Sequence, residues 1–197
     1  MSWSAGCGTG LVGMVEGVGR QVVVPLQDSG TFSGEAAVAT IVQKDGQVLV
    51  LDNGAYCKRL GKLATLMGRK TTILPHAEDA PVSPAELETA LRADASITHV
   101  GLIHCETGTG VINPLQAVSE ICARYGKGLI VDAMSSFAAL PIDARRLKFD
   151  ALVAASGKCL EGVPGMGFVF VRNEVIDGAA GNSHSLAMDL HDQHVYM

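Results

Sequence analysis

Short apolar runs alternate with amphipathic stretches along this chain, and that alternation limits the possible folds more than any other feature. We expect strands at Val22–Leu26, Gln47–Leu51, Thr71–Leu74, His99–His104, Gly128–Val131, Ala151–Ala155 and Gly167–Val171. We expect helices at Thr31–Val42, Ala55–Met67, Ser83–Ala93 and Pro114–Tyr125. Parallel strands need a crossover connection, and a helix usually supplies it. The pattern therefore predicts an α/β fold, in which a mostly parallel sheet carries helices on both faces.

The first twenty residues do not share this pattern. Residues 1–20 are rich in glycine and poorly periodic, so we expect an irregular segment there and one domain over residues 21–197. A chain of 197 residues can bury one sizeable core but is too short for two ordinary domains. Gly8–Gly13 formally matches GxGxxG. A dinucleotide site needs a strand directly before that motif, and Met1–Cys7 has no strand pattern, so we interpret the match as chance.

Charge and cysteine content exclude several classes of function. The net charge is -5 and no basic cluster stands out, which argues against a nucleic-acid or anionic membrane partner. No apolar run reaches the roughly 18 residues of a membrane-spanning helix. The 5 cysteines form no CxxC pair, and no Cys or His pair has metal-ligand spacing. We therefore expect free thiols, no metal site and a cytoplasmic location.

An acid and a lysine follow two neighbouring apolar runs. Asp132 ends the run that begins at Gly128, and Lys158 follows Ala151–Ala155, 158 − 132 = 26 residues later. That spacing allows one strand, a connection and the next strand, so both side chains can face one pocket beyond the strand ends. Pyridoxal phosphate chemistry needs such a pair, a lysine to form the Schiff base and an acid to keep the pyridine nitrogen protonated. Without this chemistry, Lys158 would be an ordinary surface lysine and Asp132 an acid in a turn.

These two motifs carry a family resemblance. With Asp132–Phe137 and Lys158–Gly165, the chain resembles the class V aminotransferases of fold type I, from about Val22 to Met197. The run that starts at Lys158 is similar to the members that act on 2-aminoethylphosphonate and pyruvate. The resemblance implies that Lys158 binds pyridoxal phosphate and moves a proton, while Asp132 holds the pyridine nitrogen. Family members are considerably longer, so the resemblance covers their large cofactor domain and the small C-terminal domain is missing.

The resemblance also implies further cofactor contacts. Ser29, Gly30 and Thr31 match the segment that binds the cofactor phosphate, Tyr56 the residue that stacks on the ring, and Thr107 a hydroxyl near the ring oxygen. A helix N-terminus with hydroxyl side chains suits a phosphate group. From the residues alone, an ordinary helix cap explains Ser29, Gly30 and Thr31 equally well. Tyr56 could equally be a core aromatic, and Thr107 a turn residue.

Some positions depart from the family pattern. Asp28 replaces the first glycine of the usual Gly-Ser-Gly-Thr-Phe, and an acid beside a phosphate is unfavourable unless it points away. Ser156 and Gly157 replace the usual Ala-Asn, and we expect Gly157 to loosen the placement of Lys158. We expect Lys158 to be partly desolvated, which would favour its neutral amine. We interpret His104, His184 and His194 as structural or surface residues. Arg145, Arg146 and Arg172 do not match the arginine of the missing small domain.

The activity implied by the resemblance is transfer of the amino group of 2-aminoethylphosphonate to pyruvate, which gives phosphonoacetaldehyde and L-alanine. Two alternatives remain open. One is another class V reaction, such as alanine–glyoxylate or serine–pyruvate transamination. The other is a truncated, inactive chain that only binds cofactor or a partner. The family also implies a homodimer for the full-length form, with small-molecule substrates.

Overall fold

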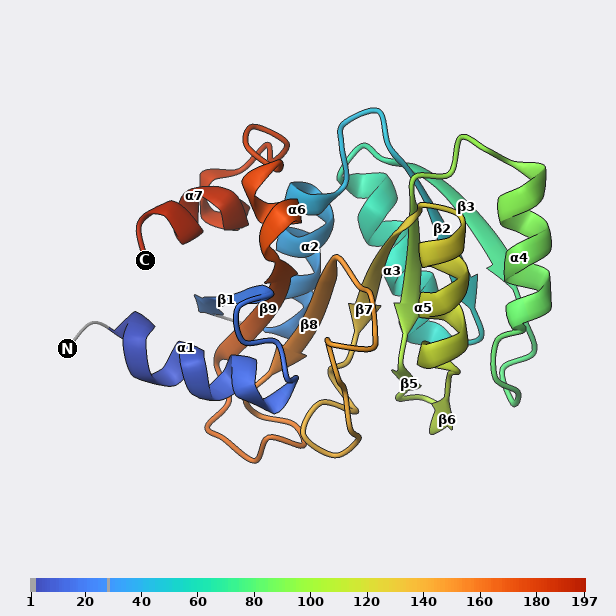
Figure 1. The fold of residues 1–197 in the computed structure, drawn as a ribbon. Coiled ribbons are helices and arrows are strands. Elements are labelled where there is room, and N and C mark those ends of the chain that lie inside the picture. Colours follow the sequence, from blue (N-terminus) through green and yellow to red (C-terminus); the bar gives the residue numbers. More distant parts are fainter. Residues whose placement is uncertain (1–2, 28) are drawn as a thin grey trace.

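The computed structural model describes residues 3–27 and 29–197, with side chains from residue 8 onward. Among these residues a single large sheet dominates the fold, with strand order β1-β9-β8-β7-β4-β2-β3 (Figure 1). Its strands are β1 (Gln21–Gln27), β2 (Gln47–Asp52), β3 (Lys70–Pro75), β4 (His99–Ile103), β7 (Gly128–Asp132), β8 (Ala151–Ala155) and β9 (Met166–Arg172). A short hairpin, β5 (Cys105–Glu106) and β6 (Val111–Ile112), follows β4.

The sheet is parallel except at β9. Strands β8, β7, β4, β2 and β3 are parallel to one another, whereas β9 is antiparallel to both β8 and β1. The predicted mostly parallel α/β sheet is therefore confirmed. Pro25 lies in β1, which pairs only with β9 at the edge of the sheet. An edge strand tolerates proline because the missing N–H is not needed by a second neighbour.

Helices cover both faces, as predicted. The helices are α1 (Trp3–Met14), α2 (Gly30–Ile41), α3 (Ala55–Leu66), α4 (Pro84–Ala93), α5 (Leu115–Arg124), α6 (Asn173–Asp177) and α7 (Leu190–Val195), with a 3-10 turn at Leu186–Met188. Leu49 and Leu51 of β2 pack in a cluster with α1, α4 and α5. Val48 and Val50 pack on the opposite face with α2, α3, α6 and α7. Successive strand residues point to opposite faces, so the continuous apolar runs fill both layers.

The N-terminal segment differs from the prediction. Residues 1–20 were expected to be irregular, yet α1 occupies Trp3–Met14. Val12 of this helix and Val15 just beyond it are buried in the cluster that contains Val23 of β1. Packing on the sheet thus stabilises a helix that its glycine-rich sequence alone does not favour. The GxGxxG match at Gly8–Gly13 lies inside α1, so it lacks the strand–turn–helix geometry of a dinucleotide site.

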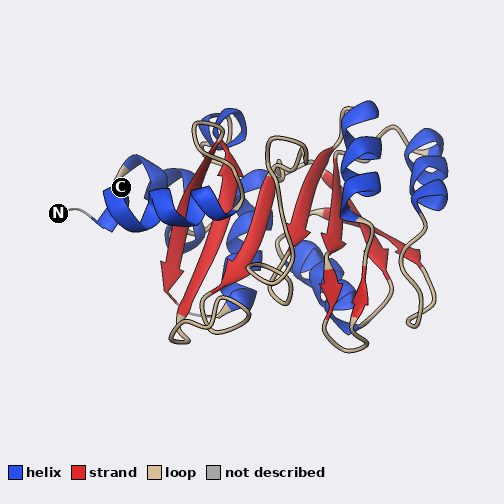
Figure 2. Cartoon of the chain, turned by 60° about the horizontal axis from the view of Figure 1, so that its bottom comes forward, coloured by secondary structure: helices blue, strands red, loops and turns tan. Residues whose placement is uncertain are grey.

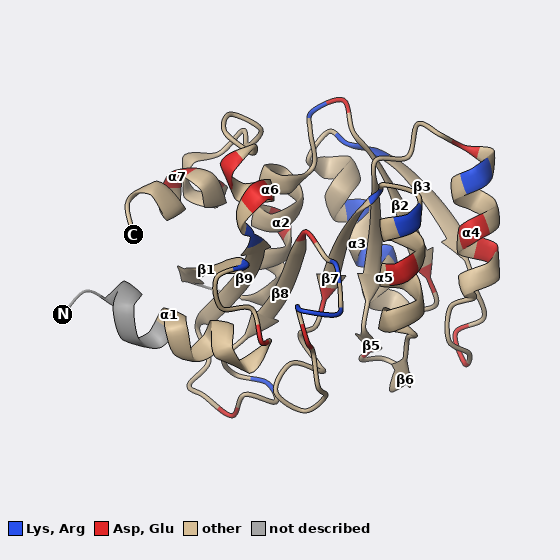
Figure 3. Ribbon diagram, viewed as in Figure 1, with Lys and Arg blue, Asp and Glu red and all other residues tan. Residues whose placement is uncertain are grey.

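The carboxyl ends of the parallel strands meet at one edge of the sheet, and the loops gather there (Figure 2). Acidic and basic residues are interspersed on α4 and α5 (Figure 3). Within the described part of the chain, no helix is long and apolar enough to cross a bilayer. The thiols of Cys57, Cys105, Cys122 and Cys159 are free, while the side chain of Cys7 lies outside the described residues.

Candidate active site

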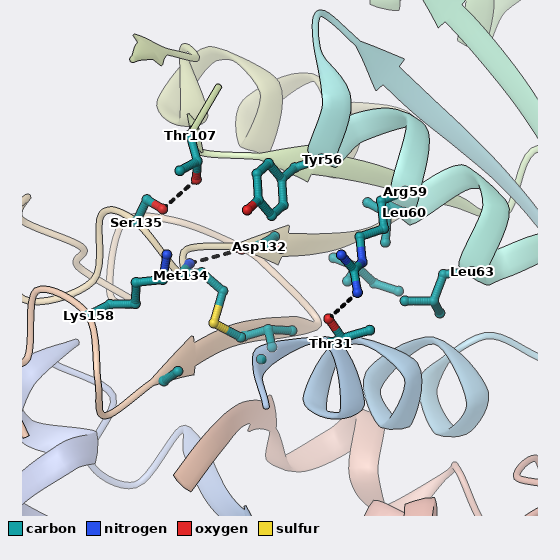
Figure 4. A pocket seen from close by; sticks show the side chains of 15 residues that line it. Thr31, Tyr56, Arg59, Leu60, Leu63, Thr107, Asp132, Met134, Ser135 and Lys158 are labelled. Atoms are coloured by element: carbon teal, nitrogen blue, oxygen red, sulfur yellow. Dashed lines mark hydrogen bonds between the residues drawn. The ribbon is translucent and has the colours of Figure 1, made fainter. Parts of the chain in front are cut away.

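A cavity of about 210 Å³ opens at this carboxyl edge (Figure 4). Its walls come from the start of α2, the first two turns of α3, the loop after β5 and the ends of β7 and β8. The lining residues are Gly30, Thr31, Gly34, Tyr56, Arg59, Leu60, Leu63, Thr107, Ile130, Asp132, Met134, Ser135, Val153, Ala155 and Lys158. All but one of the seven residues predicted from the resemblance therefore line one cavity, and the exception, Ser29, directly precedes it at the start of α2.

Asp132 is held at the end of β7. The strand pairs in parallel with β4 and β8, where Asp132 faces Ile103 and Val153. Its carbonyl accepts a hydrogen bond from His104 N at 2.8 Å. The carboxylate oxygen Oδ1 accepts from Met134 N at 2.9 Å. Among the described residues, Oδ2 has no hydrogen-bond partner, so this oxygen is available to a ligand in the cavity.

The surroundings of Asp132 favour its protonated form. The pKa of this carboxyl is raised to about 6, chiefly by burial and to a smaller extent by the negative charge of Glu106. The Met134 N–H and the charge of Lys158 act in the opposite direction. An isolated carboxyl of this kind is costly to ionise. A cation placed against Oδ2 would remove that cost. Asp132 is therefore a suitable hydrogen-bond partner for a positively charged N–H group.

Lys158 lies on a loop that is tied at its base by Ser156. Ser156 N donates to Met166 O at 2.9 Å, and Ser156 Oγ donates to Val163 O at 2.6 Å. Gly162 N donates back to Ser156 O at 2.8 Å. These bonds close the loop between β8 and β9. The serine that replaces the usual alanine of the family therefore anchors the loop that carries the lysine.

Two expectations about this loop need revision. Lys158 is exposed in the structure, so the partial desolvation that we predicted is wrong for this chain: the loop leaves the amine at the open side of the cavity. Gly157 was expected to loosen the loop. A Cβ at Gly157 would instead lie 3.0 Å from three atoms of Pro164, so the glycine permits close packing of the two ends of the loop.

The start of α2 has features that would suit an anion. The first turn of a helix leaves N–H groups without intrahelical partners, and Ser29, the N-cap residue, makes no side-chain cap bond. Thr31 Oγ1 accepts a hydrogen bond from Arg59 Nη2 of α3 at 2.8 Å. Arg59 was not predicted, although it stands one helical turn after Tyr56 and so shares its face. Asp28, the predicted departure beside this turn, lies outside the described residues.

Tyr56 and Thr107 face the cavity from the α3 side (Figure 4). Tyr56 is 39% exposed, so its ring is an accessible wall of the cavity and not a core aromatic. Thr107 Oγ1 lies 2.6 Å from Ser135 Oγ, which links the loop after β5 to the loop after β7. Ser135 was not predicted, and its place in the sequence three residues after Asp132 was the available signal.

A buried amide pair supports the turn before α3. Asn53 Nδ2 donates to Asn113 Oδ1 at 2.9 Å, and Asn113 Nδ2 returns a bond to Asn53 Oδ1 at 3.1 Å. Asn113 Nδ2 also donates to Ile103 O at 2.8 Å. The pair joins the ends of β2 and β4 to the start of α5. Both residues are buried and complete each other's hydrogen bonds, so their role is structural.

Other predicted residues stand outside the cavity. His104 is buried, and its Nδ1 lies 2.9 Å from Ser136 Oγ. Burial lowers the pKa of this imidazole, which keeps it neutral. His184 and His194 belong to the C-terminal segment, near and within α7. Arg145, Arg146 and Arg172 line a separate cavity with the start of β1 and the end of β9.

Comparisons with known proteins agree with this geometry. Residues 27–185 match the family described as Aminotransferase class-V. The chain is 69% identical over 187 residues to 2-aminoethylphosphonate–pyruvate transaminase 2 of Polaromonas sp. (strain JS666), covering 95% of this chain and 50% of that protein. It is 60% identical over 187 residues to the 2-aminoethylphosphonate–pyruvate transaminase of Cupriavidus necator, with the same coverage. The chain spans about half the length of the curated relatives it matches.

Solved structures share the fold at lower identity. A ureidoglycine–glyoxylate aminotransferase from Bacillus subtilis superposes with a TM-score of 0.89 at 23% identity, over 96% of this chain and 49% of that one. An alanine–glyoxylate aminotransferase from Nostoc sp. superposes with a TM-score of 0.89 at 24% identity, over 96% and 50%. At these identities the likeness concerns the fold alone. It matches the α/β architecture predicted from the sequence.

Proposed function

We propose that this chain, which belongs to the class-V aminotransferase family, is the cofactor-binding part of an enzyme that transfers the amino group of 2-aminoethylphosphonate to pyruvate. The observation that carries the proposal is that Lys158, Asp132, Tyr56 and Thr31 line one cavity. The substrates are inferred from relatives of that name at 69% and 60% identity. The products would be phosphonoacetaldehyde and L-alanine.

Pyridoxal phosphate is the cofactor of this family, and the residues present fit it. The cofactor has a phosphate, an aromatic ring, a ring nitrogen and an aldehyde. The start of α2 with Thr31 and Arg59 suits the phosphate, Tyr56 suits the ring face, Asp132 Oδ2 suits the nitrogen, and Lys158 suits the aldehyde. A Cβ at Gly30 would lie 2.5 Å from Met134 Sδ, so any other residue here would require the Met134 side chain to move.

The bound cofactor supplies an electron sink for the carbanion that forms when the substrate carbon loses its proton. The residues of this chain have separate parts in that step. Lys158 Nζ would take the proton from the substrate carbon and deliver it to the cofactor carbon that carries the aldehyde. Asp132 Oδ2 accepts the hydrogen bond of the protonated ring nitrogen and so keeps the positive charge in place. Tyr56 covers one face of the ring and limits its tilt.

Arg59 gives a specific prediction about the phosphate. Arg59→Gln should weaken the binding of pyridoxal phosphate about tenfold, because a charged hydrogen bond to an anion is worth ~1.5–3 kcal/mol and this one is exposed. Binding of pyridoxal, which lacks the phosphate, should be unchanged. Fluorescence titration of both ligands measures the difference. Lys62→Gln, a charge change one turn later on the same helix, is the matched control. An equal loss for both ligands would contradict the assignment.

Alanine formation tests the proposed activity. We expect amino transfer from 2-aminoethylphosphonate to pyruvate to be faster than transfer from L-alanine to glyoxylate or from L-serine to pyruvate, the two alternative reactions. Mass spectrometry of the products from 15N-labelled donors measures each transfer. Preference for glyoxylate would favour the alanine–glyoxylate alternative. Cofactor binding without transfer from any donor would favour a chain that only binds the cofactor.

We also propose that the full-length form is a cytoplasmic homodimer. The support is the open side of the cavity: Lys158 is exposed and the Tyr56 ring is 39% exposed. A carbanion needs a site that excludes water. Another domain or subunit over this side would provide that exclusion. Sedimentation of the full-length protein with and without cofactor measures the assembly.

A further inference from the structure

Glu106 is a buried acid next to two residues that line the cavity: it bonds the backbone N–H of Tyr56 and directly precedes Thr107. It ends β5 and is 0% exposed. Among the described residues it has no Lys, Arg or His within ion-pair distance. A buried carboxylate without a cation is costly, so the groups that stabilise it must be found among hydrogen-bond donors and dipoles.

The start of α3 supplies those groups. Glu106 Oε2 accepts from Tyr56 N at 3.1 Å and from Cys57 N at 3.3 Å. Glu106 Oε1 accepts from Gly108 N at 3.1 Å. The carboxylate thus caps α3 from 49 residues away and faces the positive end of the helix dipole. Charge-assisted hydrogen bonds of this kind are about twice as strong as neutral ones.

Gly54 makes room for this cap. It is the N-cap residue of α3 and has no side chain to bond the first turn. A Cβ at Gly54 would collide with Cγ of Glu106 and lie 2.6 Å from its Cδ. The usual local cap is therefore absent, and the distant acid occupies its place. The Cys57 thiol donates to Glu106 Oε2 at 3.5 Å, and burial together with the acid's charge raises the pKa of this thiol to about 12.

The cap reaches two walls of the cavity. Tyr56 belongs to the first turn of α3, so the bond to its N–H fixes the backbone that carries the ring. Thr107 lies between Glu106 and Gly108, whose N–H bonds the same carboxylate. Glu106 therefore also holds the turn that carries Thr107. The negative charge of Glu106 also acts on Asp132, because it raises the pKa of that carboxyl. Two negative charges at this end of the cavity favour a protonated ring nitrogen over a neutral one.

We propose that Glu106 is a positioning residue of the cofactor site: its carboxylate caps the start of α3 and so holds the backbone that carries the Tyr56 ring, and its charge also acts on the Asp132 carboxyl. This inference rests on the proposed function, since it names residues that act on the cofactor. The effect of Glu106 on Asp132 can also be measured in the cofactor-free chain. Glu106 touches no reacting atom and acts through Tyr56, Thr107 and Asp132.

Glu106→Gln is the deciding variant, because it keeps the shape and one acceptor oxygen but removes the charge. In the cofactor-free chain, 13C NMR should show the Asp132 carboxyl titrating at lower pH than in the wild type. With cofactor, the dissociation constant should rise about tenfold, because the Tyr56 ring is no longer held in place and the charge that favours a protonated ring nitrogen is lost. The visible circular dichroism of the bound cofactor should weaken as the Tyr56 ring loses its fixed position. Glu120→Gln on α5, an exposed acid, is the matched control and should behave as the wild type.

The outcomes separate this inference from the proposed function. If the wild-type chain binds no cofactor, the proposed function fails, while the Asp132 titration still tests Glu106. If Glu106→Gln binds the cofactor as tightly as the wild type, with an unchanged Asp132 titration, the inference is wrong. Loss of the fold in Glu106→Gln would also overturn it, because the acid would then serve stability alone. Glu106→Asp, which keeps the charge, should restore the Asp132 titration but not the dichroism, since its shorter side chain moves away from Tyr56 N.

Discussion

Lys158→Ala should abolish covalent attachment of pyridoxal phosphate to this chain. Lys158 lines the same cavity as Asp132 (Figure 4). Borohydride reduction followed by peptide mapping should place the cofactor on the peptide that contains residue 158 in the wild type. The variant should give no labelled peptide. The half-reaction with an amino donor should fall by on the order of 10²–10⁴, the usual contribution of a positioned proton-transfer group.

Two controls make the Lys158 result specific. Lys62→Ala removes an amine from the groove beside the cavity and should leave the label in place. Lys158→Arg keeps the positive charge but cannot form the covalent bond at neutral pH, so it should also remain unlabelled. A label on any other lysine of the wild-type chain would contradict the assignment. The loop would then hold Lys158 for another purpose.

The strand ends were predictable from the sequence, and the reason is local. β7 and β8 are short apolar runs, and the polar residues at or just after the end of each run must lie at the carboxyl edge of a parallel sheet. Asp132 and Lys158 follow that rule, so their convergence was predicted without a structure. The start of α2 at Gly30 follows from helix-capping rules in the same way.

The contacts between segments were not predictable, because no local pattern encodes them. Glu106 stands about fifty residues from Tyr56, and only the packing of β5 against α3 brings them together. One signal existed: Gly54 begins a helix without a capping side chain, which requires a cap from elsewhere. The helix α1 was missed for a similar reason, since it depends on the burial of Val12 against the sheet. The exposure of Lys158 depends on how the loop after β8 folds back, which composition does not determine.

Asp132→Asn should separate stability from function at this site. The pKa of Asp132 is raised from 3.8 to about 6, chiefly by burial. The native state therefore holds this proton more tightly than the unfolded state does. It follows that the carboxyl reduces the free energy of unfolding as pH rises from about 4 to about 6. The asparagine variant avoids this cost. Its melting temperature in the absence of cofactor should exceed that of the wild type by a few degrees at pH 7.5 and equal it near pH 3.5.

The same variant should lose most of the amino-transfer reaction at pH 7.5. Asparagine cannot hold a protonated ring nitrogen by charge, so the stabilisation of the developing carbanion falls by several kcal/mol, a rate loss of about 10²–10³. Stopped-flow measurement of the half-reaction gives the rate, and calorimetry of the cofactor-free chain gives the stability. Asp177→Asn, an exposed acid of α6, should change neither. An unchanged rate would remove Asp132 from the reaction. A lower melting temperature at pH 7.5 would mean that Asp132 is charged and well stabilised in the native state, contrary to the burial that surrounds it.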